Sequence, residues 1–265
     1  MRSLSLNQWR DLDYGASAPW LFPGDEQVLE RESGVKSCVY QSLKEYCASP
    51  EYECTPDHHL HLGLLPIPYI GDLANASVYI LMLNPGFSPG DYFAEYEQPK
   101  SRDAAVANLK QDFKKTDYPF VCLNPEFAWS PGYTYWQKKF DDVIRRLSED
   151  LSFTYRNAAR LVAQNVACLE LFPYHSRSFA HRKILSKLPS VEAMRDYVRS
   201  QIKPKAMSGE ATVIVTRSVK DWGIDWDDTN AVVYTGAEAR AAHLSSKSRG
   251  GKAIYERLLG LRSCD

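Results

Sequence analysis

The stretch Ser77-Val-Tyr-Ile-Leu-Met-Leu83 is the most informative part of this 265-residue sequence for its fold. Apart from Ser77, every residue in it is apolar or aromatic. The run stops at Asn84-Pro-Gly-Phe-Ser-Pro-Gly-Asp91, which is dense in turn-forming residues. A short apolar run that ends at Gly and Pro is typical of a buried strand followed by an irregular loop. We therefore expect a strand here, with a loop at its carboxyl end.

Three more apolar runs resemble this one, and helical patterns separate them. The runs are Asn165-Val-Ala-Cys-Leu-Glu-Leu-Phe172, Ala211-Thr-Val-Ile-Val-Thr216 and Ala231-Val-Val-Tyr234. Helical patterns occur near residues 35–47, 101–115, 134–148, 155–162, 181–188, 191–203 and 251–261. Short apolar strands that alternate with helices predict a parallel sheet covered on both faces. The sequence thus predicts an α/β fold, a three-layer α/β/α sandwich with a central, mainly parallel four-stranded sheet.

The first 75 residues differ in composition from the rest, because they are rich in Tyr, Pro and acidic residues. We interpret residues 1–75 as an N-terminal elaboration packed on a main domain of residues 76–265. The N-terminus lacks the apolar core of a signal peptide, and no apolar run has the length of a membrane span. We expect a cytoplasmic protein with no membrane partner, and a monomer.

The cysteine and histidine patterns favour a protein without a metal or a cofactor. The six Cys include no CxxC pair, which disfavours zinc ribbons and common iron–sulfur spacings. The cluster Asp57-His-His-Leu-His61 has no helical spacing and no clear fourth ligand, so a solvated loop is the favoured interpretation. No glycine-rich nucleotide-binding loop of the GxGxxG or Walker type follows the first strand.

The net charge of −1 hides a strong asymmetry along the chain. Residues 1–150 contain 14 Lys and Arg against 22 Asp and Glu, a balance of −8. Residues 151–265 contain 18 against 11, a balance of +7. A basic half is typical of a protein that binds a polyanion, although two ordinary solvated helix faces would give the same counts.

In open parallel sheets the ligand site lies beyond the carboxyl ends of the strands. This rule selects the loop after Leu83, the segment 170–176, Arg217 and the stretch after Tyr234 that carries His243.

Two of these segments carry motifs of a known superfamily. Leu81-Met-Leu-Asn-Pro-Gly86 resembles the first motif of the uracil-DNA glycosylases, in the Asn-Pro-Gly form of the mismatch-specific and single-strand-selective branches. Ala242-His-Leu-Ser-Ser-Lys-Ser-Arg-Gly-Gly251 resembles their last motif, and Leu169-Glu-Leu-Phe-Pro-Tyr174 stands in place of their middle strand. The resemblance covers roughly residues 75–260, in the order and spacing of one fold. Leu244 stands where the family has Pro, and Glu170 stands where an Asn is typical.

The resemblance implies two catalytic residues, Asn84 and His243. Asn84 would orient the attacking water through its amide oxygen, and His243 would donate to the base oxygen as negative charge develops there. The structural alternatives are a turn residue that caps the following loop, for Asn84, and a surface histidine on a basic loop, for His243.

A flipped base needs a pocket with aromatic faces. The aromatic candidates are Phe87, Tyr92, Phe93, Phe172 and Tyr174, some of which we expect to be core residues. Gly86 stands where the strictly uracil-specific branch has a bulky aromatic, so a group at the pyrimidine 5-position would be tolerated. Glu170 accepts hydrogen bonds only, which suits the amine of cytosine; alternatively, it forms a salt bridge with Arg217.

The remaining predicted contacts are to the DNA backbone. The candidates are Ser88, Ser245, Ser246, Lys247 and Arg249, and the alternative for the later four is a mobile polar loop. Arg217 would contact a phosphate or a base substituent, or form an ion pair with Asp221 or Asp225.

These expectations together indicate a monofunctional DNA glycosylase without cofactor, acting on double- or single-stranded DNA. The favoured substrate is a 5-substituted cytosine, as in the hypermodified DNA of phages, with a role in anti-phage defence. The alternatives are a uracil-DNA glycosylase of base-excision repair, a non-catalytic DNA-binding module, and a small-molecule enzyme of the doubly wound class.

Overall fold

The computed structural model describes residues 5–54, 58–227 and 229–261. The chain forms two compact units, and each unit takes three separate segments. The first unit comprises Met1–Tyr69, Leu83–Lys110 and Glu170–Tyr197, and the second comprises Ile70–Met82, Gln111–Leu169 and Val198–Asp265. The units therefore interleave along the sequence, and the boundary at residue 75 between an elaboration and a main domain stays a prediction.

The five-stranded sheet has the order β3-β5-β4-β6-β7. The strands are β3 (Tyr69–Ile70), β4 (Val78–Met82), β5 (Val166–Glu170), β6 (Thr212–Val215) and β7 (Val232–Val233). β4 pairs in parallel with β6, with Val78 opposite Thr212 and Leu81 opposite Val215, and β6 pairs in parallel with β7. Every residue of β4 and β5 is buried, as expected for strands that are covered on both faces.

The four predicted strands are confirmed, but the prediction of a four-stranded sheet is wrong. The fifth strand, β3, has only two residues and directly follows the Pro-broken stretch 64–68. A strand this short has no periodicity to detect, and the two prolines next to it indicate an irregular segment rather than a strand.

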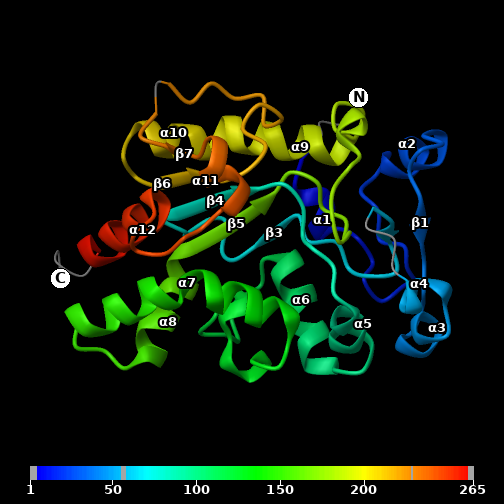
Figure 1. Cartoon of the computed structure of the whole chain (residues 1–265), viewed down its shortest axis with the longest axis horizontal. Helices are drawn as coiled ribbons and strands as arrows, with labels where there is room; N and C mark the ends of the chain where they lie inside the picture. The colour runs from blue at the N-terminus through cyan, green and yellow to red at the C-terminus, as the bar shows by residue number, and fades with distance from the viewer. Residues whose placement is uncertain (1–4, 55–57, 228, 262–265) are drawn as a thin grey trace. The chain divides into compact units, whose positions relative to one another are not determined.

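Helices of the second unit lie on both sides of its sheet, with α10 on one side and α7 and α8 on the other (Figure 1). Ser130, Thr154 and Ser248 cap the amino ends of α7, α8 and α12 through their side chains. The helices are α7 (Pro131–Asp150), α8 (Tyr155–Asn165), α10 (Lys203–Met207), α11 (Gly236–Ala241) and α12 (Arg249–Gly260), with short helical turns at Val121–Leu123, Pro125–Phe127 and Val198–Ile202.

The first unit is built from shorter elements. Its helices are α1 (Asn7–Arg10), α2 (Asp25–Arg31), α3 (Leu43–Cys47), α4 (Pro50–Glu53), α5 (Pro89–Tyr96), α6 (Pro99–Lys110) and α9 (Pro189–Tyr197), with a 3-10 turn at Arg182–Ile184. β1 (Ser37–Cys38) and β2 (Leu60–His61) pair in parallel as a small second sheet.

Two helix predictions need correction. The predicted helix 35–47 is strand β1 followed by the shorter helix α3, because Ser42 caps α3 and starts it late. The predicted helix 181–188 is one 3-10 turn at Arg182–Ile184, since Pro189 starts the next helix directly afterwards. Among the described residues, no helix has the length and apolar character needed to span a bilayer.

Candidate active site

The loop Leu83–Ser88, called here the Asn84 loop, begins one residue after β4 and ends at the cap of α5. The segment that follows β5 holds it in place. The Phe172 N–H donates to the Leu83 carbonyl at 2.8 Å, and the His175 ring lies 2.8 Å from the Gly86 carbonyl. Two segments about 90 residues apart in sequence therefore form one local structure in the first unit.

The Asn84 side chain has a defined orientation. Its Nδ2 lies 3.1 Å from the Pro85 carbonyl oxygen, 3.4 Å from the Ser176 carbonyl oxygen and 3.3 Å from Ser176 Oγ. Because carbonyl oxygens only accept hydrogen bonds, the amide must turn its NH2 group toward them. Its Oδ1 therefore points away from Ser176, and it accepts no hydrogen bond from any residue that the structure describes. Asn84 is partly exposed, so this acceptor is available to a water molecule.

His175 supports the same loop and was not predicted as a site residue. One ring nitrogen lies 2.8 Å from the Gly86 carbonyl, and the other lies 3.1 Å from the Leu65 carbonyl. Both partners are carbonyl oxygens, so the ring joins the Asn84 loop to the backbone at Leu65. Burial raises the pKa of Asp91, and the His175 ring opposes this shift. The only sequence signal was the position of His175 directly after the middle-strand motif.

Gly86 is exposed and has free space around it. A Cβ atom built on it would meet no heavy atom within 4 Å. Its neighbour Phe87 stacks on His61, with ring centroids 3.5 Å apart and the planes inclined by 6°. His61 is buried on β2, and burial lowers its pKa to about 3, so the ring beneath Phe87 is neutral.

The other four predicted aromatic residues differ in burial. Tyr92 is fully buried and stacks on Tyr46 at 4.3 Å, while Phe93 is 41% exposed. Phe172 and Tyr174 are buried against each other. Tyr92, Phe172 and Tyr174 are thus parts of packed core in the first unit, whereas Phe93 reaches the surface.

Glu170 and Ser88 have clear structural positions. Glu170 is the last residue of β5 and is 3% exposed, and its N–H donates to the Pro68 carbonyl at 2.9 Å. The reading of a base amine by Glu170 stays a prediction. Ser88 is the N-cap of α5, and its N–H donates to Asp91 Oδ2 at 2.7 Å.

In the second unit, the residues 242–248 form the loop between α11 and α12, called here the His243 loop. Ala242 and Leu244 are buried on either side of the exposed His243. Leu244, which stands where the glycosylase motif that this loop resembles has Pro, is buried and anchors the loop. The Tyr234 hydroxyl donates to the His243 carbonyl at 2.6 Å, and Lys139 Nζ donates to the Ala242 carbonyl at 2.5 Å. The backbone is held on both sides, and the imidazole projects outward.

Two of the predicted phosphate contacts, Ser246 and Arg249, already have partners inside the molecule. Asp142 on α7 accepts from the Ser246 N–H at 2.6 Å and from the Ser246 hydroxyl at 2.5 Å. Arg249 donates to Glu238 at 2.7 Å and to the Val233 carbonyl at 2.6 Å. Ser245 accepts from the Ser248 hydroxyl, and Lys247 is exposed. A phosphate would have to compete with Asp142 and Glu238 for Ser246 and Arg249.

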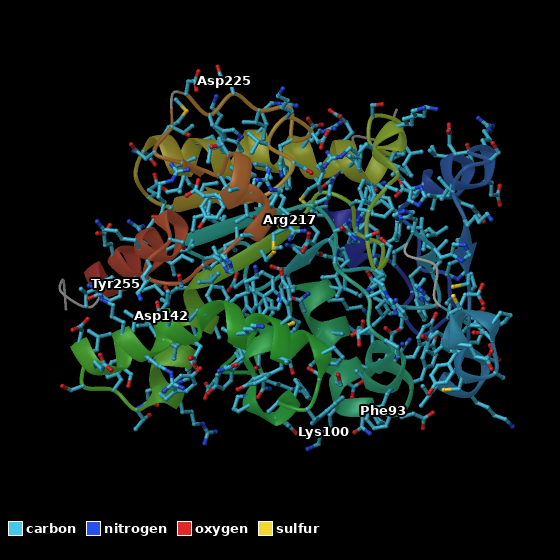
Figure 2. All side chains as sticks on the ribbon, viewed as in Figure 1. Phe93, Lys100, Asp142, Arg217, Asp225 and Tyr255 are labelled. Atoms are coloured by element: carbon cyan, nitrogen blue, oxygen red, sulfur yellow. The ribbon has the colours of Figure 1, made fainter. Side chains whose placement is uncertain are left out.

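Arg217 follows β6 by two residues and is partly buried. Its Nε is buried and has no hydrogen-bond partner among the described residues. Figure 2 shows Asp225 on the outer edge of the following loop, well separated from Arg217. The suggested ion pair with Asp225 is therefore not formed.

The histidine cluster is not the solvated loop that was expected, since His61 is buried in β2. The His58 ring lies 2.9 Å from Ser178 Oγ, and the His59 ring lies 3.8 Å from a Glu51 oxygen. Asp57 lies outside the described residues. Within the described part of the chain, no three His, Cys, Asp or Glu side chains are grouped as a metal site would require.

A scan against models of protein families gives no match, and searches of curated proteins and of solved structures find no similar protein. The functional argument therefore depends on the residues themselves. Neither Asn84 nor His243 is buried in packed core, and their joint action stays a prediction.

Proposed function

We propose that this protein is a monofunctional DNA glycosylase that flips a modified pyrimidine out of DNA and hydrolyses its N-glycosidic bond. The fold that this proposal assigns to it is the three-layer α/β/α sandwich of the uracil-DNA glycosylases. The proposal depends chiefly on the orientation of Asn84, whose NH2 group is bound by carbonyl oxygens while its Oδ1 stays available.

Cleavage of an N-glycosidic bond builds positive charge on the sugar and negative charge on the departing base. A water molecule bound to Asn84 Oδ1 would be held with its oxygen toward the sugar carbon. An amide is too weak a base to remove the proton early, so the ion-like sugar in the transition state must supply most of the reactivity. Asn84 positions the water, whose oxygen bonds to the sugar carbon as the bond to the base breaks. The base leaves with the bonding electrons and takes up, through solvent, the proton that the water loses.

His243 stabilises the leaving base in this scheme. Its N–H donates to the base oxygen on which negative charge develops. The exposed ring between two buried neighbours is consistent with that role, because the loop backbone is anchored while the imidazole remains accessible.

The proposed substrate is a cytosine with a group at the 5-position, as in phage DNA. The support for it is the open space around Gly86, where the uracil-specific branch has a bulky ring. Such an enzyme would act in defence against phages. Uracil removal in base-excision repair is the alternative. A preference for 5-modified cytosine or for uracil distinguishes the two functions.

The central experiment compares wild type with Asn84→Ala on uracil-containing, plain and 5-modified DNA. We expect abasic sites from the wild-type protein in one susceptible DNA, and a loss of at least about 100-fold in kcat for Asn84→Ala, the size reported for removal of one key transition-state group. Asn75→Ala is the matched control, because Asn75 is an exposed turn residue that bonds to Asp72.

If both proteins leave every DNA intact, the glycosylase proposal is wrong. Salt-sensitive DNA binding without abasic products would instead establish a non-catalytic DNA-binding module. Absence of DNA binding even at low salt would favour a small-molecule enzyme.

A separate variant tests the choice of base. Glu170→Asn exchanges an acceptor-only side chain for an amide that can also donate. If Glu170 reads the amine of cytosine, the ratio of kcat/KM for uracil over cytosine-type substrates rises by about tenfold, since one discriminating contact contributes about 1–3 kcal/mol. An unchanged ratio would remove Glu170 from base recognition.

A further inference from the structure

One face of α7 lies against the His243 loop in the second unit. Lys139 donates from Nζ to the Ala242 carbonyl at 2.5 Å, and Asp142, labelled in Figure 2, accepts from the Ser246 hydroxyl at 2.5 Å. Side chains three or four positions apart share one face of a helix. Tyr135 is four residues before Lys139, so it continues this face toward the amino end of α7.

The Tyr135 ring is exposed and has two neighbours on α7. Lys139 Nζ lies over the ring, 5.3 Å from its centroid. The buried ring of Trp136 makes a T-shaped contact with it, with centroids 5.3 Å apart and planes inclined by 89°. Tyr135 is nevertheless 41% exposed. Because Lys139 Nζ contacts both the ring and the Ala242 carbonyl, the exposed ring lies beside the backbone that carries His243.

The carboxylates next to Lys139 in sequence do not neutralise its charge. Asp141 is paired with Arg145 at 2.9 Å, and Asp142 is bound to Ser246. In the part of the chain that the structure describes, no carboxylate forms an ion pair with Lys139. Its ammonium group has three donors, of which two point to backbone carbonyls. One donor and the positive charge therefore remain for an anion.

We propose that this face of α7 binds single-stranded DNA, with an unpaired base stacked on the Tyr135 ring and a phosphate of the same strand at Lys139. Every nucleobase has a flat π-face, so an exposed aromatic ring beside a cation suits a single strand of any sequence. In a duplex, the neighbouring base pairs cover these faces. This inference rests on the proposed function, because it names the form of DNA that binds at the His243 loop.

Binding of plain DNA tests the stacking site without requiring excision. Fluorescence anisotropy is measured with a labelled single strand, with its duplex, and with a strand of the same length whose bases are replaced by abasic residues. Tyr135→Leu keeps an apolar side chain against Trp136 and removes the ring. We expect it to bind the single strand about tenfold more weakly than wild type, and the duplex and the abasic strand within about twofold of wild type.

The salt dependence separates stacking from charge. Titrations of the single strand are repeated from about 50 to 200 mM KCl. Tyr135→Leu should keep the wild-type slope of log K against log salt, because stacking releases no counterion. Lys139→Met should lower that slope by about 0.7, the value for one phosphate contact on a single strand. Lys139→Arg keeps the charge and should keep the slope.

Two tyrosine variants control for damage to the fold. Tyr135→Phe keeps the aromatic face and should bind the single strand as wild type does. Tyr52→Leu removes a tyrosine of similar exposure, 50%, from α4 in the first unit, and it should also bind as wild type does.

Wild-type affinity of Tyr135→Leu for the single strand would overturn the site. Equal losses on the single strand, the duplex and the abasic strand would also overturn it, because the ring would then act only through the structure of α7. A loss confined to the strand with bases, without abasic products from the wild type on any DNA, would keep the stacking site and reject the glycosylase. Excision with unaltered single-strand binding in Tyr135→Leu would do the reverse.

Discussion

The amide of Asn84 shows how neighbouring atoms can determine the chemistry available to one residue. Two carbonyl oxygens and one hydroxyl surround its nitrogen, so the orientation of the group follows from which atoms can donate. Ser176 is buried and held within the segment that also places His175. The availability of Oδ1 is therefore a consequence of this segment as well as of Asn84 itself.

The open space around Gly86 predicts how substitutions of this single residue affect stability and substrate choice. Because a Cβ atom there meets no neighbour and the backbone is not in the left-handed region, Gly86→Ala and Gly86→Tyr should keep the free energy of unfolding within about 0.5 kcal/mol of wild type. If the open flank admits a 5-substituent, Gly86→Tyr should lower kcat/KM for 5-substituted bases by roughly 100-fold and leave unsubstituted bases nearly unaffected. Competition between the two DNAs in one reaction measures this ratio. Equal losses on both would show that the flank does not face the base.

At the scale of elements, the contact between α7 and the His243 loop is the feature with the clearest consequence. Lys139 and Asp142 are three residues apart and so lie on one face of α7. One binds the start of the loop at Ala242, and the other binds Ser246. The helix thus stabilises the backbone that carries His243, although it lies outside the segments that resemble glycosylase motifs.

The start of α12 is tightly packed against the same loop. A Cβ atom on Gly251 would lie 1.9 Å from the Ser245 carbonyl oxygen and 2.4 Å from that of Leu244. Gly251→Ala should therefore destabilise the protein by about 1–3 kcal/mol through forced backbone shifts. Gly260→Ala in the last turn of the same helix is the control, since its Cβ meets open space, and it should stabilise by up to about 1 kcal/mol.

Urea unfolding of both variants measures this difference. If Gly251→Ala is as stable as Gly260→Ala, the His243 loop can move away from α12 without lowering the free energy of unfolding.

At the scale of the whole molecule, the two units share the chain so thoroughly that neither corresponds to a continuous segment. The free energy of unfolding and the charge balance of the protein are therefore properties of the full chain. The excess of basic residues after residue 150 supplies the general attraction for DNA in the proposed function.

Asp25 makes the stability of the molecule depend on pH. It is fully buried, where it accepts from the Tyr174 hydroxyl at 2.6 Å and from the Ser190 N–H at 3.0 Å. Burial raises its pKa from 3.8 to about 6, against the lowering effect of these hydrogen bonds. Between these values the folded state holds the proton more tightly than the unfolded state. The free energy of unfolding therefore falls as pH rises from about 4 to 6, by roughly 3 kcal/mol from this group.

Urea unfolding at pH 4, 5, 6 and 7 tests this expectation, with Asp25→Asn as the variant that cannot titrate and the exposed Asp225→Asn as the control. The difference between wild type and Asp25→Asn should change with pH, and the control should follow wild type. A constant difference would mean that Asp25 stays charged when folded.

Local patterns in the sequence were enough to predict the strands β4, β5, β6 and β7 and the helices α7, α8 and α12. These elements can be recognised from short stretches of sequence, because each contains an apolar run, a periodic apolar face or a capping residue. The sequence also placed Asn84 and Arg217 at strand ends. It missed β3 and misread residues 35–47 and 181–188, where the elements are only a few residues long.

The surroundings of these residues depend on contacts between segments that are distant in the sequence. The bonds from Asn84 to Ser176, from Lys139 to Ala242 and from Ser246 to Asp142 each join positions about 90 to 105 apart in the chain. No local pattern encodes such pairs, because they arise only when strands and helices pack together. The same packing made Tyr92, Phe172 and Tyr174 core residues.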